Sequence, residues 1–415
     1  MKWIKPSEID GEIRAPSSKS MMIRATAAGL LSGGETRITN SSFCDDALAS
    51  LSIIESLGAD VAKINQDLII KSGLGPIRTH YLDCRESGLC IRMYTPIAGL
   101  RTEKITLSGS GSLLNRPMGM MERPLSQLGC YCQTNSEHLP VQVKGPLKGG
   151  GVQVDGSQSS QFLTGLLMAL PLCKNDSEVT VRNLKSKPYI AMTLSLLSAF
   201  GISIDYEEDF SQFYIKGSQH FQCKPYRVEG DWSGASFFLV AGALGGCVKI
   251  HNLSMQSIQA DKRILDALEQ MGAKISTKDD IVVVEQGHLN AFEFDATQCP
   301  DLFPPLAVLA CFCKGRTEIH GVERLSIKES NRAESLLNEF RKIGAEITIE
   351  GNKMIVDGNS LEGGSIDSHG DHRIAMAAAV AGLCSHKGVA LYDWKCVSKS
   401  YPGFFEDLES ISRRE

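Results

Sequence analysis

The sequence has no large excess of charge of either sign. Its formal net charge is −5, and charged residues make up 22% of the chain. A nucleic-acid-binding protein of this size usually carries a broad basic surface, so we expect no nucleic-acid partner. Hydrophobic residues contribute 42% of the chain, which is the proportion of an ordinary globular protein and excludes a disordered or fibrous one.

Long apolar runs are also missing. Apolar segments such as 234–247 and 372–384 are shorter than the ~20 residues that cross a bilayer, so we expect them to be buried core helices. The N-terminal segment is polar and is interrupted by Pro6 and Gly11, where a signal peptide would have an apolar core. We therefore expect no membrane partner and a cytoplasmic location.

Paired cysteine spacings are absent as well. The thirteen cysteines are an odd number, and several lie inside apolar runs, which is typical of reduced thiols packed as small hydrophobic side chains. Cys130 and Cys132, like Cys311 and Cys313, lack a second pair or histidines at the spacing of a zinc site. The polar run SHGDHR (368–373) contains His and Asp side chains that could bind a metal, but they are too close together in the sequence to surround one ion. We expect neither a disulfide framework nor a metal site.

What the sequence does contain is an internal repeat of about seventy residues. A helix that ends in an apolar residue and a glycine, followed by two short strands, occurs five times. Its glycines are separated by 71, 72, 71 and 72 residues. Glycine suits the left-handed position that ends a helix, and the partial two-residue alternation that follows predicts a hairpin. The five glycines are Gly58, Gly129, Gly201, Gly272 and Gly344.

The same elements precede each hairpin: an apolar helix, a strand and an amphipathic helix. We expect these strands at 35–40, 103–109, 178–183, 247–252 and 316–321. A sixth helix, strand and helix occupy 371–412, but the chain ends before their hairpin. We expect the N-terminal segment 3–16 to supply the missing strands.

This arrangement joins both ends of the chain in one domain. The expected bounds are 1–17 plus 229–415 for that domain and 18–228 for a continuous second one. A chain of 415 residues also exceeds the size at which one hydrophobic core usually keeps growing. Strands interleaved with helices and hairpins predict two similar α/β lobes rather than a solenoid.

Charged residues gather at the N-terminal ends of the apolar helices. Lys19 and Arg24 begin the first helix, Arg92 lies in the second and Arg373 begins the sixth, although a helix N-terminus already carries about half a positive charge. If the units repeat in space as in sequence, three such helix ends meet in each lobe and form an anion site. A ligand with phosphate or carboxylate groups would explain the cations.

Two further stretches add cations to this set. IKESNRAESL (327–336) places Lys328, Glu329 and Arg332 at the start of an amphipathic helix, although charges at this spacing are more often a solvated helix face. The Pro-broken loop 112–124 offers Arg116 and Arg123.

Seven motifs, in this order, resemble those of the 5-enolpyruvylshikimate-3-phosphate (EPSP) synthases, a family of enolpyruvyl transferases. They are SKSMMIR (18–24), DGSQSSQFLTGLLMALPL (155–172), SKPY (186–189), VEGD (228–231), IKESNR (327–332), DHRIAM (371–376) and VSKSYPGFF (397–405). The resemblance runs nearly end to end, and DGSQSSQFLT and DHRIAM are its most specific parts. It implies an inverted α/β barrel fold of two lobes, each of three βαβαββ units, which agrees with the six-fold repeat.

The resemblance also implies an activity. The family transfers the enolpyruvyl group of phosphoenolpyruvate to the 5-hydroxyl of shikimate 3-phosphate and releases phosphate, by addition and elimination through a tetrahedral intermediate in a closing cleft between the lobes. This step belongs to the shikimate pathway of chorismate and aromatic amino acid biosynthesis. The resemblance implies no metal and no cofactor, and we expect a monomer.

Site residues follow from the same resemblance. Shikimate 3-phosphate is expected to contact Lys19, Ser20, Arg24, Ser159, Ser160, Gln161, Ser186, Tyr189, Asp301 and Lys328. Phosphoenolpyruvate is expected to contact Lys19, Gly88, Arg92, Arg116, Gln161, Arg332, Arg373 and Lys399. Arg116 keeps the family's spacing from the preceding strand, and Arg123 is the alternative. Two carboxylates and an amine can move the protons that the reaction requires, and we expect them to be Asp301, Glu329 and Lys19, with their individual roles left open.

One loop departs from the family pattern. The family's Gly-Asn-Ala-Gly-Thr-x-x-Arg-Pro is here CRESGLCIRM (84–93), which keeps Gly88 and Arg92 but has Glu86 for Asn and Leu89 for Thr. In the family this loop faces phosphoenolpyruvate. The changes therefore bear on affinity for that substrate and on sensitivity to glyphosate.

Two alternatives to this function stay open. UDP-N-acetylglucosamine enolpyruvyl transferase has the same fold but uses a cysteine in a mobile loop, and residues 108–122 contain no cysteine. The other alternative is a non-catalytic phosphate-binding protein of the same fold. The complete set of Lys19, Asp301, Glu329 and Lys399 argues against it.

Overall fold

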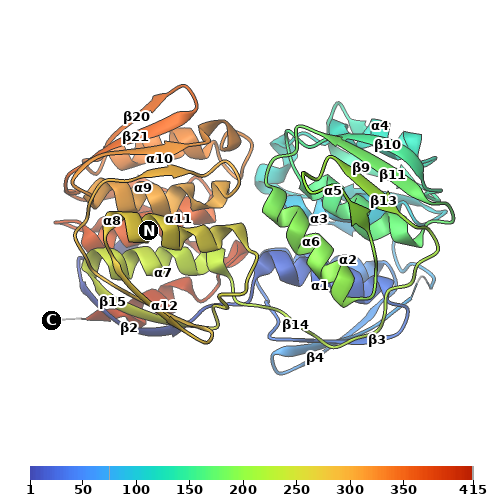
Figure 1. Cartoon of the computed structure of the whole chain (residues 1–415), viewed down its shortest axis with the longest axis horizontal. Helices are drawn as coiled ribbons and strands as arrows, with labels where there is room; N and C mark the ends of the chain where they lie inside the picture. Colours follow the sequence, from blue (N-terminus) through green and yellow to red (C-terminus); the bar gives the residue numbers. More distant parts are fainter. Residues whose placement is uncertain (74, 414–415) are drawn as a thin grey trace. The chain divides into compact units, whose positions relative to one another are not determined.

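The computed structural model describes residues 1–73 and 75–413, and the chain divides into two compact units (Figure 1). Unit 1 comprises Met1–Ser18 and Glu229–Glu415, and unit 2 comprises Lys19–Val228. Ser18 thus lies with unit 1, one residue away from the boundary expected from the sequence, because its N–H donates to the carbonyl of Glu229 (2.8 Å).

Unit 2 contains three copies of a module made of a four-stranded sheet and two helices. The second copy has sheet order β6-β7-β9-β8 and consists of β6 (Tyr81–Asp83), α3 (Gly88–Ala98), β7 (Lys104–Ser108), α4 (Glu122–Gln127), β8 (Tyr131–Asn135) and β9 (His138–Lys144). The third has sheet order β10-β11-β13-β12 and consists of β10 (Gly150–Asp155), α5 (Gln161–Ala169), β11 (Ser177–Arg182), α6 (Lys187–Ala199), β12 (Asp205–Tyr206) and β13 (Gln212–Ile215). In each, the first strand pairs parallel with the second.

The first copy in unit 2 is completed by a strand from the far end of the unit. It consists of α1 (Lys19–Leu31), β3 (Glu35–Thr39), α2 (Asp45–Ser56), β4 (Asp60–Ile64) and β5 (Asp67–Lys71), with β14 (Tyr226–Arg227) as the first strand. The sheet order is β14-β3-β5-β4, and β14 pairs parallel with β3. The chain therefore enters and leaves unit 2 at the same sheet.

Unit 1 repeats the module three more times, with a five-stranded sheet in the fourth copy and a three-stranded sheet in the sixth. The fourth copy consists of β2 (Glu8–Arg14), α7 (Trp232–Gly245), β15 (Gly246–His251), α8 (Ile264–Met271), β16 (Lys274–Lys278) and β17 (Ile281–Glu285), with β24 (Ser412–Arg413) added beside β2. The fifth consists of β18 (Glu293–Asp295), α9 (Phe303–Phe312), β19 (Gly315–His320), α10 (Arg332–Arg341), β20 (Glu346–Glu350) and β21 (Lys353–Gly358). The sixth consists of β22 (Gly364–Asp367), α11 (His372–Cys384), β23 (Val389–Tyr392), α12 (Phe404–Ser410) and β1 (Lys2–Ile4).

The predicted repeat is confirmed, with an additional strand at the start of each copy. All five repeat glycines have positive φ, between 78° and 107°, as expected for the left-handed residue that ends a helix. The five hairpins and the strands that precede them lie where the sequence predicts them, within one residue at each end of β3, β7, β11, β15 and β19.

The prediction for the N-terminal segment is only half right. β1 does complete the sixth sheet, where it pairs antiparallel with β23. β2 instead pairs parallel with β15 as the first strand of the fourth copy. The reason is that no strand lies between Glu229 and α7, where Gly230 forms only an isolated bridge with Ser17, so the N-terminal segment supplies the parallel partner of β15. Figure 1 shows the blue strand β2 beside β15.

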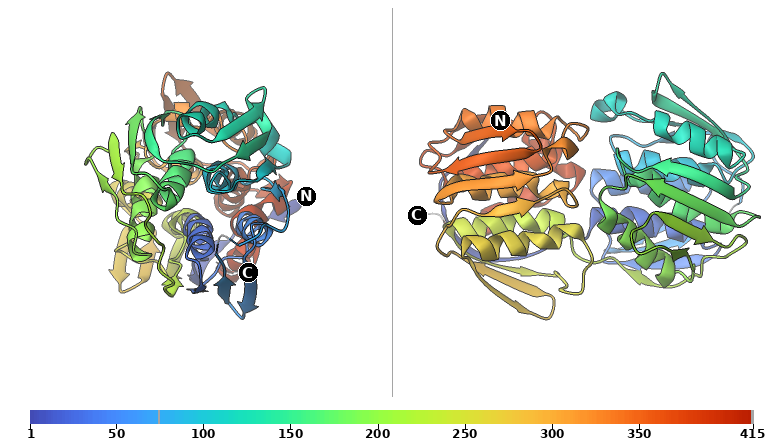
Figure 2. Two further views of the ribbon diagram at one scale, coloured as in Figure 1. Left: turned by 90° about the vertical axis from the view of Figure 1, so that its right-hand side faces the viewer. Right: turned by 45° about the horizontal axis from the view of Figure 1, so that its top comes forward.

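One helix of each module is almost wholly buried, and the other covers the outside. Every residue of α3 is buried, and in α7 and α11 only Ser233, Gly245 and Cys384 are partly rather than fully buried. The prediction of core helices near 234–247 and 372–384 is therefore confirmed. The left panel of Figure 2 looks nearly along several helices of the blue-to-teal part of the chain. Over the described ranges, no helix is long and apolar enough to cross a membrane.

Candidate active site

In unit 1 the N-terminal ends of three buried helices meet. Arg373, in the first turn of α11, donates from Nη2 to the Ser233 hydroxyl of α7 (3.1 Å) and to Asp301 Oδ2 (3.1 Å). Asp301 lies in the short 3-10 turn Pro300–Leu302 that leads into α9. Because each helix end carries partial positive charge, the three ends place positive charge beside Arg373.

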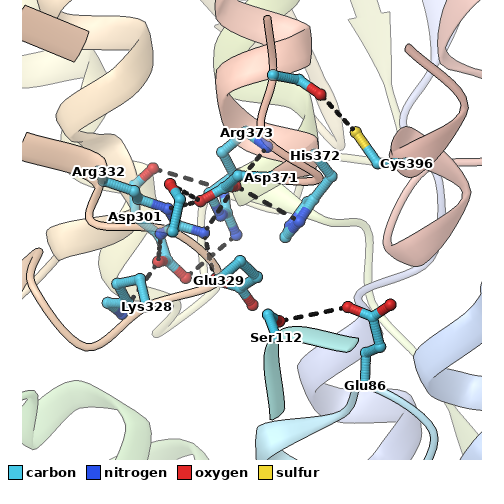
Figure 3. A network of polar contacts seen from close by, with 12 residues as sticks. Glu86, Ser112, Asp301, Lys328, Glu329, Arg332, Asp371, His372, Arg373 and Cys396 are labelled. Carbon is cyan, nitrogen blue, oxygen red and sulfur yellow. Dashed lines mark hydrogen bonds and ion pairs between the residues drawn. The ribbon is translucent and has the colours of Figure 1, made fainter. Parts of the chain in front are cut away.

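Arg332 is the centre of this cluster and is only 1% exposed. Its guanidinium donates to Asp301 Oδ1 (2.7 Å), Glu329 Oε2 (2.7 Å) and Asp371 Oδ2 (2.8 Å), as Figure 3 shows. Burial acts to lower the pKa of Arg332, but the three carboxylates outweigh burial and raise it above its ordinary value. Arg332 is therefore a permanent cation that holds three acidic side chains together.

Asp301 accepts hydrogen bonds from three cations. Lys328 Nζ lies 3.2 Å from Asp301 Oδ1, and Arg332 and Arg373 complete the set. Burial alone would raise the pKa of Asp301, but the nearby cations hold it well below its usual range. Burial lowers the pKa of Lys328, and Asp301 opposes that shift. Asp301 is thus ionised at neutral pH and can orient a donor or accept a proton, but it has no proton to give.

The helix expected over 327–336 is wrong in its first part. α10 begins at Arg332 with Asn331 at the N-cap position, so Lys328 and Glu329 lie in the preceding loop. The loop is not helical because its side chains bind elsewhere in unit 1: Lys328 pairs with Asp301 (3.2 Å), and the Ser330 hydroxyl donates to Asp371 (3.2 Å). The alternative of a solvated helix face is therefore wrong as well.

Lys399 is the remaining predicted cation of unit 1. It is the last residue of the 3-10 turn Trp394–Lys399 and is buried. This turn packs against α11, the helix that begins with Arg373.

In unit 2 two arginines lie at the N-terminus of α3. Arg92 donates to Gln161 Oε1 at the start of α5 (2.9 Å) and to the carbonyl of Pro117 (3.2 Å). Arg116 is buried, and a Cβ added at Gly88 would lie 2.5 Å from its Nη1 and 3.3 Å from Arg92 Nη1. Glycine at position 88 is therefore what gives the two guanidinium groups room.

The alternative residue Arg123 is placed differently from Arg116. It lies in the first turn of α4 and is exposed. The loop that leads to Arg116 is fastened to the turn before α3: Ser110 N–H donates to the carbonyl of Arg85 (2.7 Å), and the Ser112 hydroxyl donates to Glu86 Oε2 (3.3 Å; Figure 3). Glu86, the departure from the family pattern, thus binds the loop that carries Arg116.

Lys19 and Arg24, the two cations at the start of α1, have different partners. Lys19 Nζ lies 3.1 Å from Asp46 Oδ2, in the first turn of α2. Arg24 is 1% exposed, and its guanidinium donates to the carbonyls of Ser20 (2.8 Å) and Tyr189 (3.2 Å). Burial lowers the pKa of Arg24 to about 10. A ligand is therefore not needed to balance Lys19, because unit 2 supplies Asp46.

The remaining predicted residues of unit 2 lie at the starts of α5 and α6. Ser159 Oγ accepts from the N–H of Gln161 (3.1 Å), and Ser160 occupies the N-cap position of α5. Ser186 precedes α6 with φ 58° and ψ 45°, a left-handed conformation that is rare for serine and is often found at functional sites. Tyr189 follows in the first turn of α6, where Arg24 binds its carbonyl.

Three side chains that contact predicted residues are absent from the predicted site: Asp46, Asp371 and Ser233. Asp371 stands in the motif DHRIAM, and its carboxylate both caps α11 and binds Arg332, so its motif was the available signal. Asp46 contacts Lys19, and Ser233 contacts Arg373, because separate helices pack together. Spacing along the chain does not reveal either contact.

Five βαβαββ modules and a sixth with one strand fewer, with cations at helix ends in both units, define an enolpyruvyl-transferase-like protein. Two solved structures share this fold: an EPSP synthase from Acinetobacter baumannii (TM-score 0.81, 24% identity, 99% of this chain and 98% of that one) and the enolpyruvyl transferase NikO from Streptomyces tendae (TM-score 0.81, 15% identity, 99% and 96%).

The family model of EPSP synthase (3-phosphoshikimate 1-carboxyvinyltransferase) matches residues 4–408. Proteins named 3-phosphoshikimate 1-carboxyvinyltransferase are 39% identical in Clostridium perfringens (strain SM101; 99% of this chain, 97% of that one) and 38% identical in Clostridium kluyveri (98% and 96%). The chain belongs to the EPSP synthase family, and the resemblance inferred from its motifs is confirmed.

Proposed function

We propose that this chain is a 3-phosphoshikimate 1-carboxyvinyltransferase, which transfers the enolpyruvyl group of phosphoenolpyruvate to the 5-hydroxyl of shikimate 3-phosphate and releases phosphate. The observation that carries the proposal is the family match across residues 4–408. The clusters of buried cations in both units support it, because both substrates are polyanions. The two alternative functions are not favoured by the family match.

Phosphoenolpyruvate carries a carboxylate and a phosphate on one small carbon frame, so several fixed cations are needed to orient it. For this substrate we propose Lys19, Gly88, Arg92, Arg116, Gln161, Arg332, Arg373 and Lys399. The buried positions of Arg92, Arg116 and Arg373 support the proposal, since a desolvated cation binds an anion more strongly than an exposed one.

For shikimate 3-phosphate we propose Lys19, Ser20, Arg24, Ser159, Ser160, Gln161, Ser186, Tyr189, Asp301 and Lys328. The strained backbone of Ser186 supports this set. So does the bonding of Arg24 to Ser20 and Tyr189, because it orders two other proposed residues around one buried cation.

The chemistry moves two protons in each direction. The 5-hydroxyl loses a proton as its oxygen attacks C2 of phosphoenolpyruvate, while C3 gains a proton to become a methyl group. Elimination then removes a proton from that methyl group and gives one to the departing phosphate, so atoms and charge balance without a further reactant. We propose Lys19, Asp301 and Glu329 for these transfers. Asp301 is held ionised by the cations around it, so its role is to orient the hydroxyl or to accept a proton. Lys19 is the candidate proton donor.

Phosphate release from phosphoenolpyruvate tests this function. The purified protein should release phosphate only when shikimate 3-phosphate is added, and UDP-N-acetylglucosamine should not replace it. Release with the nucleotide sugar would instead support the other enolpyruvyl transferase, and no release with either acceptor would support a binding protein. Repeating the assay with glyphosate measures the effect of the loop that contains Glu86.

The proposal also includes a monomer located in the cytoplasm. The relatives are named as carboxyvinyltransferases, an activity on soluble metabolites, which supports the location. Light scattering coupled to size-exclusion chromatography measures the oligomeric state, since the monomer mass is 45.1 kDa.

A further inference from the structure

Asp261 is a buried acid of unit 1 that the proposed mechanism does not use. It lies in the 3-10 turn Ala260–Arg263 that precedes α8 and is 3% exposed. One carboxylate oxygen, Oδ2, accepts from the Ser233 hydroxyl. The other, Oδ1, is buried and has no hydrogen-bond partner among the described residues. Leaving a buried carboxylate oxygen without a partner is costly, so the position calls for an explanation.

The neighbours of Asp261 on its own turn do not neutralise it. Lys262 Nζ donates to the carbonyl of Met255 (2.9 Å), and Arg263 binds Asp266 (3.1 Å) and the carbonyl of Asp295 (3.1 Å). Both cations are thus engaged with other partners. The contact between Asp261 and Ser233 is therefore the feature that connects this acid to the rest of the cluster.

Ser233 connects Asp261 to Arg373. A hydroxyl has one hydrogen to donate. When Ser233 donates it to Asp261, the lone pairs of Oγ remain available, and Arg373 Nη2 donates to this oxygen (3.1 Å). The backbone of Ser233 is fixed as well, because its N–H donates to Asp231 Oδ1 at the N-cap of α7 (2.9 Å). The carboxylate thus dictates the direction of the hydroxyl, and the hydroxyl holds one arm of the guanidinium.

We propose that Asp261 is a positioning residue for the reaction described above: through the Ser233 hydroxyl, its carboxylate fixes the Arg373 guanidinium in the orientation that binds the anionic groups of phosphoenolpyruvate. The inference rests on the proposed function, and Arg373 is the residue through which it acts. An ionised carboxylate is required for this role, since only then is Ser233 obliged to act as the donor.

The charge of Asp261 depends on pH in the range where the enzyme can be assayed. Burial and then repulsion from Asp301 raise the pKa of Asp261 to about 6, against the opposing attraction of Arg373. The other ionisable groups that act on this acid are Asp231 at the start of α7 and the Cys299 thiol before α9, whose own pKa is raised mainly by burial. Protonation below pH 6 should therefore loosen Arg373.

Steady-state kinetics of three variants at saturating shikimate 3-phosphate test the proposal. Asp261→Asn and Ser233→Ala should each raise KM for phosphoenolpyruvate about tenfold, the effect of one buried hydrogen bond, with a much smaller change in kcat. The double variant should also show about a tenfold increase. Independent sites would instead give about a hundredfold, and that result would overturn the proposal.

The pH profile supplies a second readout that a merely structural role would not change. The ratio of KM in Asp261→Asn to KM in the wild type should be about ten at pH 8 and should approach one as the pH falls below 6, because the wild-type acid then also becomes neutral. Ionisation of phosphoenolpyruvate itself cancels in this ratio. A ratio that stays constant from pH 5 to 8 would contradict the inference.

Matched controls separate positioning from damage to the fold. Ser236 lies on the same helix, is buried and donates to the carbonyl of Ser233 (2.7 Å); Ser236→Ala should leave KM unchanged. Asp266→Asn removes an exposed acid from the adjacent helix and should also have no effect. If either control raises KM as much as Ser233→Ala does, the proposal is wrong.

If Asp261→Asn does not fold, Ser233→Ala still decides the question: the dependence of KM on a group titrating near pH 6 should disappear in that variant, and its persistence would refute the role of the bridge. A wild-type protein that releases no phosphate with shikimate 3-phosphate would overturn the proposed function. If the wild type is active but the effects of Asp261→Asn and Ser233→Ala on KM are additive, only the present inference is overturned.

Discussion

Lys19 illustrates how a single side chain is prepared for chemistry before any substrate is present. Its ammonium lies 3.1 Å from the buried carboxylate of Asp46, so the charge that a helix N-terminus disfavours is balanced by the neighbouring helix α2. An amine held in one position by a buried partner loses little entropy when it meets a substrate. This pairing makes Lys19 a testable candidate for proton transfer.

We predict that Lys19→Met lowers turnover by at least about a thousandfold, because it removes both a charge and a proton donor. The fold should remain intact by circular dichroism, although Asp46 loses its partner and the melting temperature should fall somewhat. Lys71→Met, which removes an exposed lysine paired with Glu35, is the control and should be fully active. Near-normal turnover in Lys19→Met would refute the assignment of Lys19.

Asp261 should also lower the free energy of unfolding when it is ionised. Its pKa is raised to about 6 in the folded protein, above its value in an unfolded chain, so the folded protein is favoured at low pH and loses stability as the pH rises from about 4 to about 6. We predict that Asp261→Asn is more stable than the wild type at pH 7.5, on the order of 2 kcal/mol, and equal to it at pH 4. Urea unfolding at both pH values measures this.

If Asp261→Asn is less stable than the wild type at pH 7.5, the buried charge of Asp261 does not destabilise the folded protein. Higher stability combined with a higher KM for phosphoenolpyruvate would instead be the pattern of a side chain retained for function at the expense of stability. Ser236→Ala again serves as the comparison, since it should have no pH-dependent effect on stability.

Sequence reasoning found the cations of the site more readily than their acidic partners. Arg92, Arg332 and Arg373 stand out because a charged residue in an apolar helix or motif is conspicuous, and motifs carry over residue by residue. Asp46 and Asp261 come from amphipathic segments where acids are ordinary. Their partners are chosen by tertiary packing, which no spacing along the chain reveals.

At the level of secondary structure, the five complete repeats were predictable because each hairpin follows a helix that must end at a left-handed glycine. The strand that begins each module could not be predicted from the residue pattern. β6, β18 and β22 have only three or four residues each, too few to show two-residue alternation. The N-terminal segment is expected to complete one sheet because the sixth copy lacks its hairpin, whereas β1 and β2 join two different sheets.

The strand β1 offers a direct test of that assignment. Ile4 is buried against α11, where a Cβ added at Gly382 would lie 2.9 Å from Ile4 Cβ, whereas Trp3 is 47% exposed. We predict that Ile4→Ala lowers the free energy of unfolding of unit 1 by about 2–4 kcal/mol and that Trp3→Ala changes it by less than about 1 kcal/mol. Urea titration followed by tryptophan fluorescence and circular dichroism measures both.

Equal effects of the two substitutions would mean that β1 does not bury one face against α11. The pair is well matched because both residues lie in the same three-residue strand, so a change in strand propensity affects them alike. The difference between them therefore reports burial alone.

At the scale of the whole molecule, the two units are built differently from the chain: one is a single segment and the other combines two segments. Unit 2 is one continuous segment, and its apolar core is a single cluster of residues between Met21 and Val228. Its first and last strands pair with each other, at Tyr226 and Ile38. Unit 1 is assembled from both ends of the chain, and β2 lies inside its five-stranded sheet between β15 and β24.

This difference predicts which part of the chain folds alone. A fragment of residues 19–228 should fold and melt cooperatively, because it keeps every strand of its sheets and its whole core. A fragment of residues 229–415 lacks β1 and β2, and with them the buried side chains of Ile4, Ile9 and Ile13, so it should aggregate or stay partly unfolded.

A permuted form of unit 1 completes the test. β24 pairs antiparallel with β2 at Arg413 and Glu8, and Lys2 binds Glu409 (3.0 Å), so the two chain ends lie close enough within unit 1 for a short linker. Residues 229–413, a glycine–serine linker and residues 1–18, joined in that order, should restore a cooperative melting transition measured by calorimetry. A folded 229–415 fragment, or a permuted chain that fails to fold, would show that the N-terminal strands are not what completes unit 1.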